Sequence, residues 1–348
     1  MKYGEIMASL RRGNAGRLYL LSGEESYYID KVRKAVLKAW GCQRDDIQVI
    51  DEGAGIGEIM GAIESAPFFA DKNVIIIRSA ALFKEKKGDA GEDRPRKLEK
   101  SFLELLQDLP DFSYVIFEYH GKADKRKKLY KVLDKAGIVL EADAIRASNI
   151  GDWLEGKLQE MNKNMNRDAY EYFVGAISSM QTVDLGFLSR ELDKLAMFMG
   201  HEERQITKEK LLLVFSDVPE ISSFAMLNAI GEGNTARALQ LFRRQMENGV
   251  YFALIVGLLA RQIRLWWQAG CLLKRGIRGR ALAGHLGQPP FIAEKTGREA
   301  AGFPPGVLKR ALVMLSDADY GLKTGQGDIV ELEAVIIVLG TRGRDGLL

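Results

Sequence analysis

The chain has 348 residues, 47% of them hydrophobic and 28% charged, which is the composition of an ordinary globular protein that is too long for one compact core. Two or three domains are therefore expected. A formal net charge of +3 is too small to make the whole chain a nucleic-acid binder, so any contact with nucleic acid has to be local.

The sequence has no segment typical of a secreted or membrane protein. Residues 1–16 lack an apolar core of signal-peptide length, and the apolar stretch 251–260 is followed by Arg261 and Arg264. The two cysteines, Cys42 and Cys271, are far apart and have no metal-ligand spacing around them. We expect a cytoplasmic protein without disulfides, metal or other cofactor.

The first strand, turn and helix have the order of a phosphate-binding loop. Residues 17–21 (RLYLL) form an apolar strand, and an amphipathic helix follows and stops at Gly41. A nucleotide-binding turn has the pattern GxxxxGK[ST], in which a lysine and a hydroxyl contact phosphate and magnesium. Here the turn consists of Ser22, Gly23, Glu24 and Glu25. Because two carboxylates stand where phosphates would bind, these residues indicate a degenerate P-loop position without catalytic residues.

A second glycine-rich turn follows the strand 47–50. It starts at Gly53, and the third glycine of a dinucleotide fingerprint, GxGxxG, would fall at Glu58. Asp51 and Glu52 also place two negative charges where a pyrophosphate would lie. We therefore interpret this segment as a flexible turn before a helix at 59–65.

The segment 65–78 (SAPFFADKNVIIIR) connects that helix to a strand at 74–77, which is apolar throughout and should be buried on both faces of a parallel sheet. Pro67, Phe68 and Phe69 precede the strand in a turn that we expect at the surface. Two adjacent aromatic side chains at a surface turn indicate a docking point for another protein. The alternative is that both side chains pack under their own helix.

The next strand, 113–117, ends at Glu118 and Tyr119, where an NTPase carries tandem acids for magnesium, so this half of a hydrolytic site is also incomplete. Six of the ten residues in 122–131 are basic. Such a run either binds a phosphate backbone or forms the solvated face of a helix. The candidates for a DNA contact are Lys122, Lys125, Arg126, Lys127 and Lys128.

Strands at 17–21, 47–50, 74–77, 113–117 and 138–140 alternate with helices, which predicts one doubly wound α/β domain at 1–145. Residues 80–100 are expected to form a mobile surface loop that runs into a helix. From Ser148 onward only helices are predicted, in a small domain at 146–216 and a third domain at 217–348. The apolar excess of 251–267 predicts a helix that is covered on several sides, by its own domain or by neighbouring subunits.

The order and spacing of several segments resemble one known family across nearly the whole chain. These segments are RLYLLSGEE, SAPFFADKNVIIIR, KADKRKKL, DLGFLSRELDKLAMF, ARQIRLWW and LKTGQGDIVELEAVIIVL. Together they are similar to the delta subunits of the bacterial DNA polymerase III clamp loader. The resemblance implies an AAA+-like domain with a five-stranded parallel sheet and helices on both faces, followed by a helical lid and a C-terminal helical collar.

The resemblance also implies a function. A delta subunit is a non-catalytic part of the polymerase holoenzyme that binds the sliding clamp (the beta subunit) and helps to open its ring for loading onto primed DNA. It favours a clamp contact by Pro67, Phe68 and Phe69, although better-known members carry leucine before phenylalanine here. The other implied partners are the gamma/tau and delta prime subunits, through the collar at 217–348, with no membrane partner.

Two other classes of function remain as alternatives. An active P-loop NTPase or a nucleotide-dependent oxidoreductase would use the two glycine turns, and magnesium-dependent ATP binding by the isolated chain would reveal the former. A stand-alone nucleic-acid binder would use residues 122–131 and the basic side of the third domain, and its affinity for DNA would depend steeply on salt.

Overall fold

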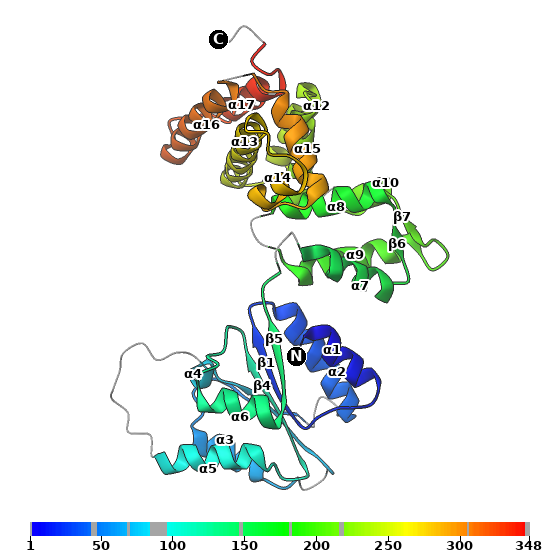
Figure 1. Cartoon of the computed structure of the whole chain (residues 1–348), viewed down its shortest axis with the longest axis vertical. Helices are drawn as coiled ribbons and strands as arrows, with labels where there is room; N and C mark the ends of the chain where they lie inside the picture. Colours follow the sequence, from blue (N-terminus) through cyan, green and yellow to red (C-terminus); the bar gives the residue numbers. More distant parts are fainter. Residues whose placement is uncertain are drawn as a thin grey trace. The chain divides into compact units, whose positions relative to one another are not determined.

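The computed structural model describes residues 2–42, 47–67, 70–83, 96–145, 149–180, 183–215, 219–304 and 306–344 (Figure 1). The chain divides into two compact units, residues 1–145 and 146–348. The predicted lid and collar both fall in the second unit, so a boundary between them at 216 stays a prediction.

The first unit is built on a five-stranded sheet with the order β2-β3-β4-β1-β5, and all neighbouring strands are parallel. The predicted fold class is confirmed. The apolar runs of the sequence become β1 (Leu18–Gly23), β2 (Ile47–Ile50), β3 (Asn73–Arg78), β4 (Ser113–Tyr119) and β5 (Ile138–Ala142).

Helices cover both faces of this sheet, because alternate residues of each strand enter different cores (Figure 1). Leu18 and Leu20 of β1 pack with the helices α3 to α6, whereas Tyr19 and Leu21 pack with α1 and α2. The helices are α1 (Tyr3–Arg11), α2 (Ser26–Trp40), α3 (Ile56–Glu64), α4 (Ala80–Phe83), α5 (Arg96–Gln107) and α6 (Lys128–Ala136). Doubly wound sheets of this kind place functional residues at the carboxyl ends of their strands.

The second unit is mostly helical. Its first part contains α7 (Ile150–Glu160), α8 (Arg167–Ser179), α9 (Leu185–Met199) and α10 (Lys208–Phe215), with the short parallel strands β6 (Asn164–Met165) and β7 (Gln205–Ile206). Its second part contains α11 (Pro219–Gly231), α12 (Thr235–Glu247), α13 (Phe252–Lys274), α14 (Gly279–Leu286), α15 (Pro290–Ala301), α16 (Val307–Thr324) and α17 (Val330–Gly340). The long helix α13 packs against α11, α14, α15 and α16.

Several predictions of elements were wrong. The expectation that strands end at Ser148 missed β6 and β7, which are two residues long and too short to show a period in sequence. The predicted loop at 80–100 contains α4 and the start of α5 at Arg96, and residues 84–95 lie outside the described residues. The helices α1, α14 and α15 were not predicted.

The burial of α13 favours cover by its own domain, which is the first of the two alternatives that the sequence left open. Ile255, Leu259 and Trp266 have no exposed surface within their own unit, and Leu258 is 3% exposed. Ile255, Leu259 and Trp266 enter a core shared with α11, α12, α14, α15, α16 and α17. The apolar excess of this helix therefore reflects internal burial.

Candidate functional site

The connection between β1 and α2 occupies the position of a nucleotide-binding loop at the carboxyl end of the central strand. Strand β1 ends at Gly23 and α2 begins at Ser26, so only Glu24 and Glu25 lie between them. A P-loop needs several more residues to wrap its backbone N–H groups around phosphates. This connection is too short to form such a cradle.

Glu25 occupies the anion position at the start of α2. Its side chain is 8% exposed and accepts a hydrogen bond from the Tyr27 N–H at 3.1 Å, as the N-cap of the helix. A helix N-terminus is the part of a P-loop that attracts phosphate, because free N–H groups and the helix dipole meet there. In this chain, a carboxylate of the protein satisfies that end of the helix.

Gly23 brings the connection between β1 and α2 into close contact with the neighbouring strand β5. Its φ is +142°, and a Cβ at this position would lie 2.0 Å from the carbonyl oxygen of Ala142 in β5. The Glu25 N–H donates to the same carbonyl at 3.0 Å, and the Ser22 hydroxyl donates to the Leu140 carbonyl at 3.2 Å. The residues of this connection therefore contact their own fold: Ser22 and Glu25 donate hydrogen bonds to β5, and Glu25 also caps α2.

A buried carboxylate lies beside this connection, at the end of β4. The Glu118 side chain has no exposed surface and accepts hydrogen bonds from Arg33 of α2 at 2.6 Å and from Arg78 of β3 at 2.9 Å. The bond to Glu118 is the main reason that the pKa of Arg78 is raised. Two further carboxylates complete the cluster, because Asp30 contacts Arg33 at 2.8 Å and Asp51 lies 3.7 Å from Arg78.

Glu118 stands at the end of β4, where an NTPase carries an acidic residue that binds magnesium. Two guanidinium groups already neutralise Glu118, so its oxygens are engaged by the protein. Among the residues that the structure describes, no group of three or more His, Cys, Asp or Glu side chains could hold a metal ion. The geometry of the carboxyl edge is that of an ion-paired structural cluster.

The basic run at 122–128 is largely neutralised by carboxylates of the same unit. Lys122 lies 3.5 Å from Glu24, Lys125 contacts Glu141 at 2.5 Å, and Arg126 contacts Asp124 at 2.9 Å. Lys127 donates to the Leu82 carbonyl at 3.0 Å, and Lys128 is exposed at the start of α6. The run precedes the helix, so four of the five predicted DNA-contact residues have partners within the protein.

The turn between α3 and β3 is fixed on both sides. The Asn73 amide donates to the carbonyls of Ala62 at 2.7 Å and Ser65 at 2.9 Å, and the Lys72 ammonium donates to the Trp40 carbonyl at 2.6 Å. Residues 64–66 and 70–71 are exposed, and Pro67 is half-buried. Phe68 and Phe69 lie outside the described residues.

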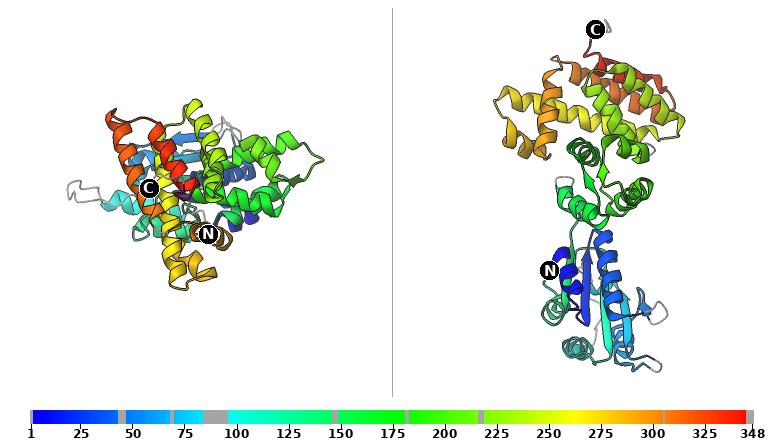
Figure 2. Two further views of the ribbon diagram at one scale, coloured as in Figure 1. Left: turned by 90° about the horizontal axis from the view of Figure 1, so that it is seen from above. Right: turned by 90° about the vertical axis from the view of Figure 1, so that its right-hand side faces the viewer.

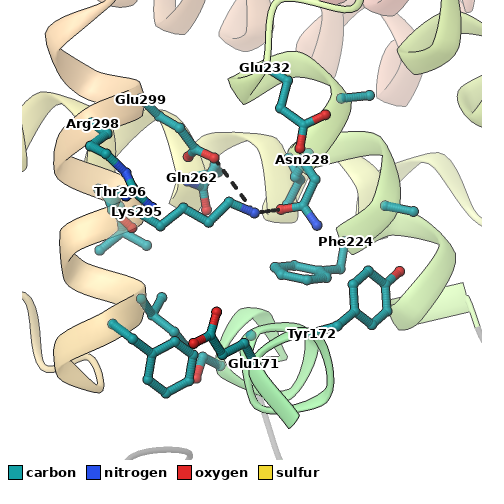
Figure 3. Close-up of a pocket in the computed structure, with 18 of the residues that line it drawn as sticks. Glu171, Tyr172, Phe224, Asn228, Glu232, Gln262, Lys295, Thr296, Arg298 and Glu299 are labelled. Carbon is teal, nitrogen blue, oxygen red and sulfur yellow. Dashed lines mark hydrogen bonds and ion pairs between the residues drawn. The ribbon is translucent and has the colours of Figure 1, made fainter. Parts of the chain in front are cut away.

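The second unit contains a cavity of about 440 Å³ that is lined by α8, α11, α13 and α15 (Figure 3). The Lys295 ammonium lies at its centre, where it donates to Asn228 Oδ1 at 2.6 Å and lies 3.8 Å from Glu299 Oε1. Glu299 also accepts a hydrogen bond from the Trp266 indole at 2.8 Å, and burial raises the pKa of its carboxyl. These groups join the helices to one another, and sequence spacing did not reveal them.

The five-stranded parallel sheet, with helices on both of its faces, defines an AAA+-like α/β domain, and a mostly helical unit follows it. No helix in the described ranges is both long and apolar enough to cross a membrane. The family follows from two sequence matches. The family model for the DNA polymerase III delta subunit matches residues 19–143, and the model for the C-terminal domain of that subunit matches residues 220–338. The chain belongs to the DNA polymerase III delta subunit family.

The fold is similar to that of a solved structure, the DNA clamp loader delta protein of Bacillus subtilis. The two share 21% sequence identity with a TM-score of 0.63, over 97% of this chain and 99% of that chain. The RuvB Holliday junction branch migration motor of Thermotoga maritima is also similar, at 12% identity over 66% of this chain and 73% of that chain, with a TM-score of 0.32. No curated protein sequence matches the chain.

Proposed function

We propose that this chain binds a sliding clamp and helps to open its ring for loading onto primed DNA, while other subunits hydrolyse ATP. The observation that carries the proposal is the match of both delta-subunit family models, one to each unit of the chain. The Bacillus subtilis protein of the same fold is a clamp loader delta protein. The mechanism is a shift in the population of clamp conformations, because a subunit that binds the open ring more tightly favours opening.

The clamp contact is assigned to Pro67, Phe68 and Phe69. The bonds made by Asn73 and Lys72 hold both ends of this turn, and the flanking residues are exposed. A partner can therefore reach the exposed residues on both sides of the pair. These features support a docking role for the aromatic pair.

The same proposal assigns no ATP hydrolysis to this chain. Its support is the closed connection between β1 and α2, where Glu25 caps the helix, together with the pairing of Glu118 by Arg33 and Arg78. A nucleotide would have to displace a carboxylate from the helix N-terminus and break two charge-assisted hydrogen bonds. ATP therefore acts through the neighbouring subunits of the loader.

Contacts with the other loader subunits, gamma/tau and delta prime, are assigned to the C-terminal helices. The buried side chains of α13 do not support this assignment. Exposed apolar side chains on α16 and α17 do support it, since Val313 is 54%, Tyr320 67% and Val330 60% exposed. Exposed apolar residues of this size are common at subunit interfaces.

The test replaces both aromatic residues in Phe68→Ala/Phe69→Ala and measures clamp binding by surface plasmon resonance. Loss of two interface aromatics costs about 2 kcal/mol or more each, so affinity should fall at least about tenfold even if the effects are not additive. The melting temperature should stay within a few degrees of the wild type. The matched control, Met197→Ala/Phe198→Ala, removes two adjacent side chains that are 81% and 64% exposed in the other unit and should bind the clamp normally.

A different pattern would contradict the assignment. If Phe68 and Phe69 belong to the core, each truncation lowers the free energy of unfolding by about 3 to 5 kcal/mol, and weaker binding follows from unfolding. Unchanged stability together with unchanged clamp affinity would place the contact elsewhere.

A further inference from the structure

The cavity in the second unit lies between helices that are far apart in the sequence. Helix α8 packs against α11 and α15, and α13 packs against the same two helices (Figure 2). The cavity that they line has a volume of about 440 Å³. Pockets of this size with a few convergent polar groups are the usual binding sites for small molecules.

One wall of the cavity is polar. Helix α15 contributes Lys295 and Glu299, which are one turn apart, and α13 contributes Gln262. Gln262 lies one turn before Trp266, whose indole N–H donates to Glu299 at 2.8 Å. The ammonium, the carboxylate and the amide therefore lie together, as Figure 3 shows.

The fold leaves part of the hydrogen-bonding capacity of these groups unused. Glu299 Oε1 is buried and accepts no hydrogen bond from any described residue, since the Lys295 Nζ lies 3.8 Å away. Asn228 takes one of the three N–H groups of the Lys295 ammonium. The side-chain amide of Gln262 has no hydrogen-bond partner within the described ranges. Because buried polar groups normally have partners, this wall offers an acceptor beside donors to a ligand.

An aromatic ring lies next to the polar wall. Phe224 of α11 is half-buried and lines the cavity, and its ring centroid is 5.6 Å from the Lys295 Nζ. Tyr172 packs edge-on against it, with the ring centroids 5.4 Å apart. Gly175 of α8 allows this position, because a Cβ there would lie 2.7 Å from the Phe224 Cζ. The ring is therefore held in place beside the free polar groups.

We propose that this cavity binds a purine nucleoside, whose base stacks on Phe224 and whose edge contacts Gln262, Lys295 and Glu299. Adenine has an amino donor beside a ring-nitrogen acceptor, and guanine has an N–H donor beside a carbonyl acceptor. Both edges match the free Glu299 oxygen beside the Lys295 ammonium. Side-chain amides bind purine edges through paired hydrogen bonds, and aromatic side chains stack on base faces.

This site differs from the P-loop position in both place and chemistry. It lies in the second unit, it recognises a base and not a triphosphate, and none of its contacts uses magnesium. It also does not depend on the clamp contact assigned to the first unit. A failure of clamp binding and a failure of nucleoside binding are therefore separate results.

The test titrates the full chain with adenosine and with guanosine by calorimetry, in the presence of EDTA. A ligand of this size with ordinary contact efficiency has a Kd of about 10 to 100 µM, and at least one of the two nucleosides should reach this range. Uridine should bind at least about tenfold more weakly, because its single ring covers less of Phe224. The proposal would be overturned if neither purine bound up to about 1 mM, or if uridine bound equally well.

The variant Gln262→Met locates the ligand in the cavity. It replaces an amide that makes no internal hydrogen bond, so the melting temperature should change little, while purine affinity should fall about tenfold. The matched control is Gln268→Met, which makes the same change at an exposed position of α13 outside the cavity and should bind like the wild type. Equal affinity of the two variants would refute the assigned contact.

Two further measurements test stacking and location. Phe224→Leu keeps an apolar side chain and should weaken purine binding about tenfold, with a smaller preference over uridine. Since Phe224 also packs on Tyr172, hydrogen exchange of the wild-type chain gives a measurement that does not depend on this variant. The nucleoside should increase protection in α8, α11 and α15 and leave the first unit unchanged. Protection only in the first unit would place the ligand elsewhere and refute the proposal.

Discussion

Replacement of Glu118 by glutamine should destabilise the first unit, because Glu118 is the buried centre of the cluster at the carboxyl edge of the sheet. Its side chain has no exposed surface and joins α2, β3 and β4 through Arg33 and Arg78. The amide of glutamine has nearly the same shape but no charge, so the substitution removes the electrostatic contacts without opening a cavity. Two guanidinium groups then lose their common anion.

The magnitude follows from the exposure of the two partners. Removal of one member of a buried ion pair costs about 3 to 5 kcal/mol. Arg78 is 44% exposed, and Arg33 retains Asp30 at 2.8 Å, so neither arginine is left without solvation or a partner. The amide oxygen of glutamine also keeps one acceptor. We therefore expect the free energy of unfolding to fall by about 2 kcal/mol for Glu118→Gln and about 3 kcal/mol for Glu118→Ala.

Hydrogen exchange followed by mass spectrometry can measure the loss of stability in the first unit separately from any change in the second unit. Peptides that cover β1, β3 and β4 should lose protection by the expected amount, while peptides from α13 and α17 should not change. The matched control is Glu141→Gln, which removes a carboxylate that is 39% exposed and pairs with Lys125. Such an exposed pair contributes about 1 kcal/mol or less.

The reasoning would be refuted if Glu118→Gln changed protection in the sheet by less than the control does. It would also be refuted if Arg33→Met and Glu118→Gln had additive effects in a double-mutant cycle, because contacting residues in a buried pair should show a coupling of at least about 1 kcal/mol.

The remaining predictions concern the helix cap, the core of the second unit and its buried acid. Glu25→Ala should lower the free energy of unfolding by about 1 kcal/mol, because the variant loses the N-cap of α2. Calorimetry on this variant should still detect no magnesium-dependent binding of ATP. A clear heat of magnesium-dependent binding would contradict the interpretation that the connection between β1 and α2 cannot hold a nucleotide. Leu259→Ala should destabilise the isolated chain by about 3 kcal/mol, measured by denaturant unfolding, and a negligible change would mean that α13 is buried only by partner subunits. Burial raises the pKa of the Glu299 carboxyl, so the folded chain binds a proton at Glu299 more tightly than the unfolded chain does. Protonation of Glu299 therefore stabilises the fold at low pH. This stabilisation is lost as pH rises from the pKa of Glu299 in the unfolded chain to its pKa in the folded chain. The melting temperature of Glu299→Gln relative to the wild type should therefore be higher at pH 8 than at pH 4, and the opposite trend in a series of thermal melts would disprove this sign.

The sheet of the first unit was predictable because its strands are short apolar runs. The segment 74–77 has no alternation, and in the structure Val74 and Ile76 enter one core while Ile75 and Ile77 enter the other. The helix α15 was not predictable in the same way, since its buried positions include Thr296 and Gly297, which carry no apolar signal. The short strands β6 and β7 are defined by their pairing and not by their composition.

For the candidate site, the sequence predicted only that the residues needed for nucleotide binding are missing, and it did not predict the contacts that are present instead. The sequence shows that the turn at 22–25 has no lysine and departs from the pattern GxxxxGK[ST], but it does not show that Glu25 caps α2. The cluster of Arg33, Arg78 and Glu118 joins residues from three separated segments, and no spacing rule connects them. The pairing of the run at 122–128 depends equally on residues far away in sequence, such as Glu24.

The two-residue connection between β1 and α2 has a consequence for how this chain can change over evolutionary time. A nucleotide site would require inserted residues, and an insertion would move Gly23 away from Ala142 and remove the Glu25 cap before any phosphate could bind. Each intermediate sequence would therefore be less stable than the present one without having gained an activity. Single substitutions cannot lengthen the connection, so its two-residue length resists conversion into a phosphate-binding loop.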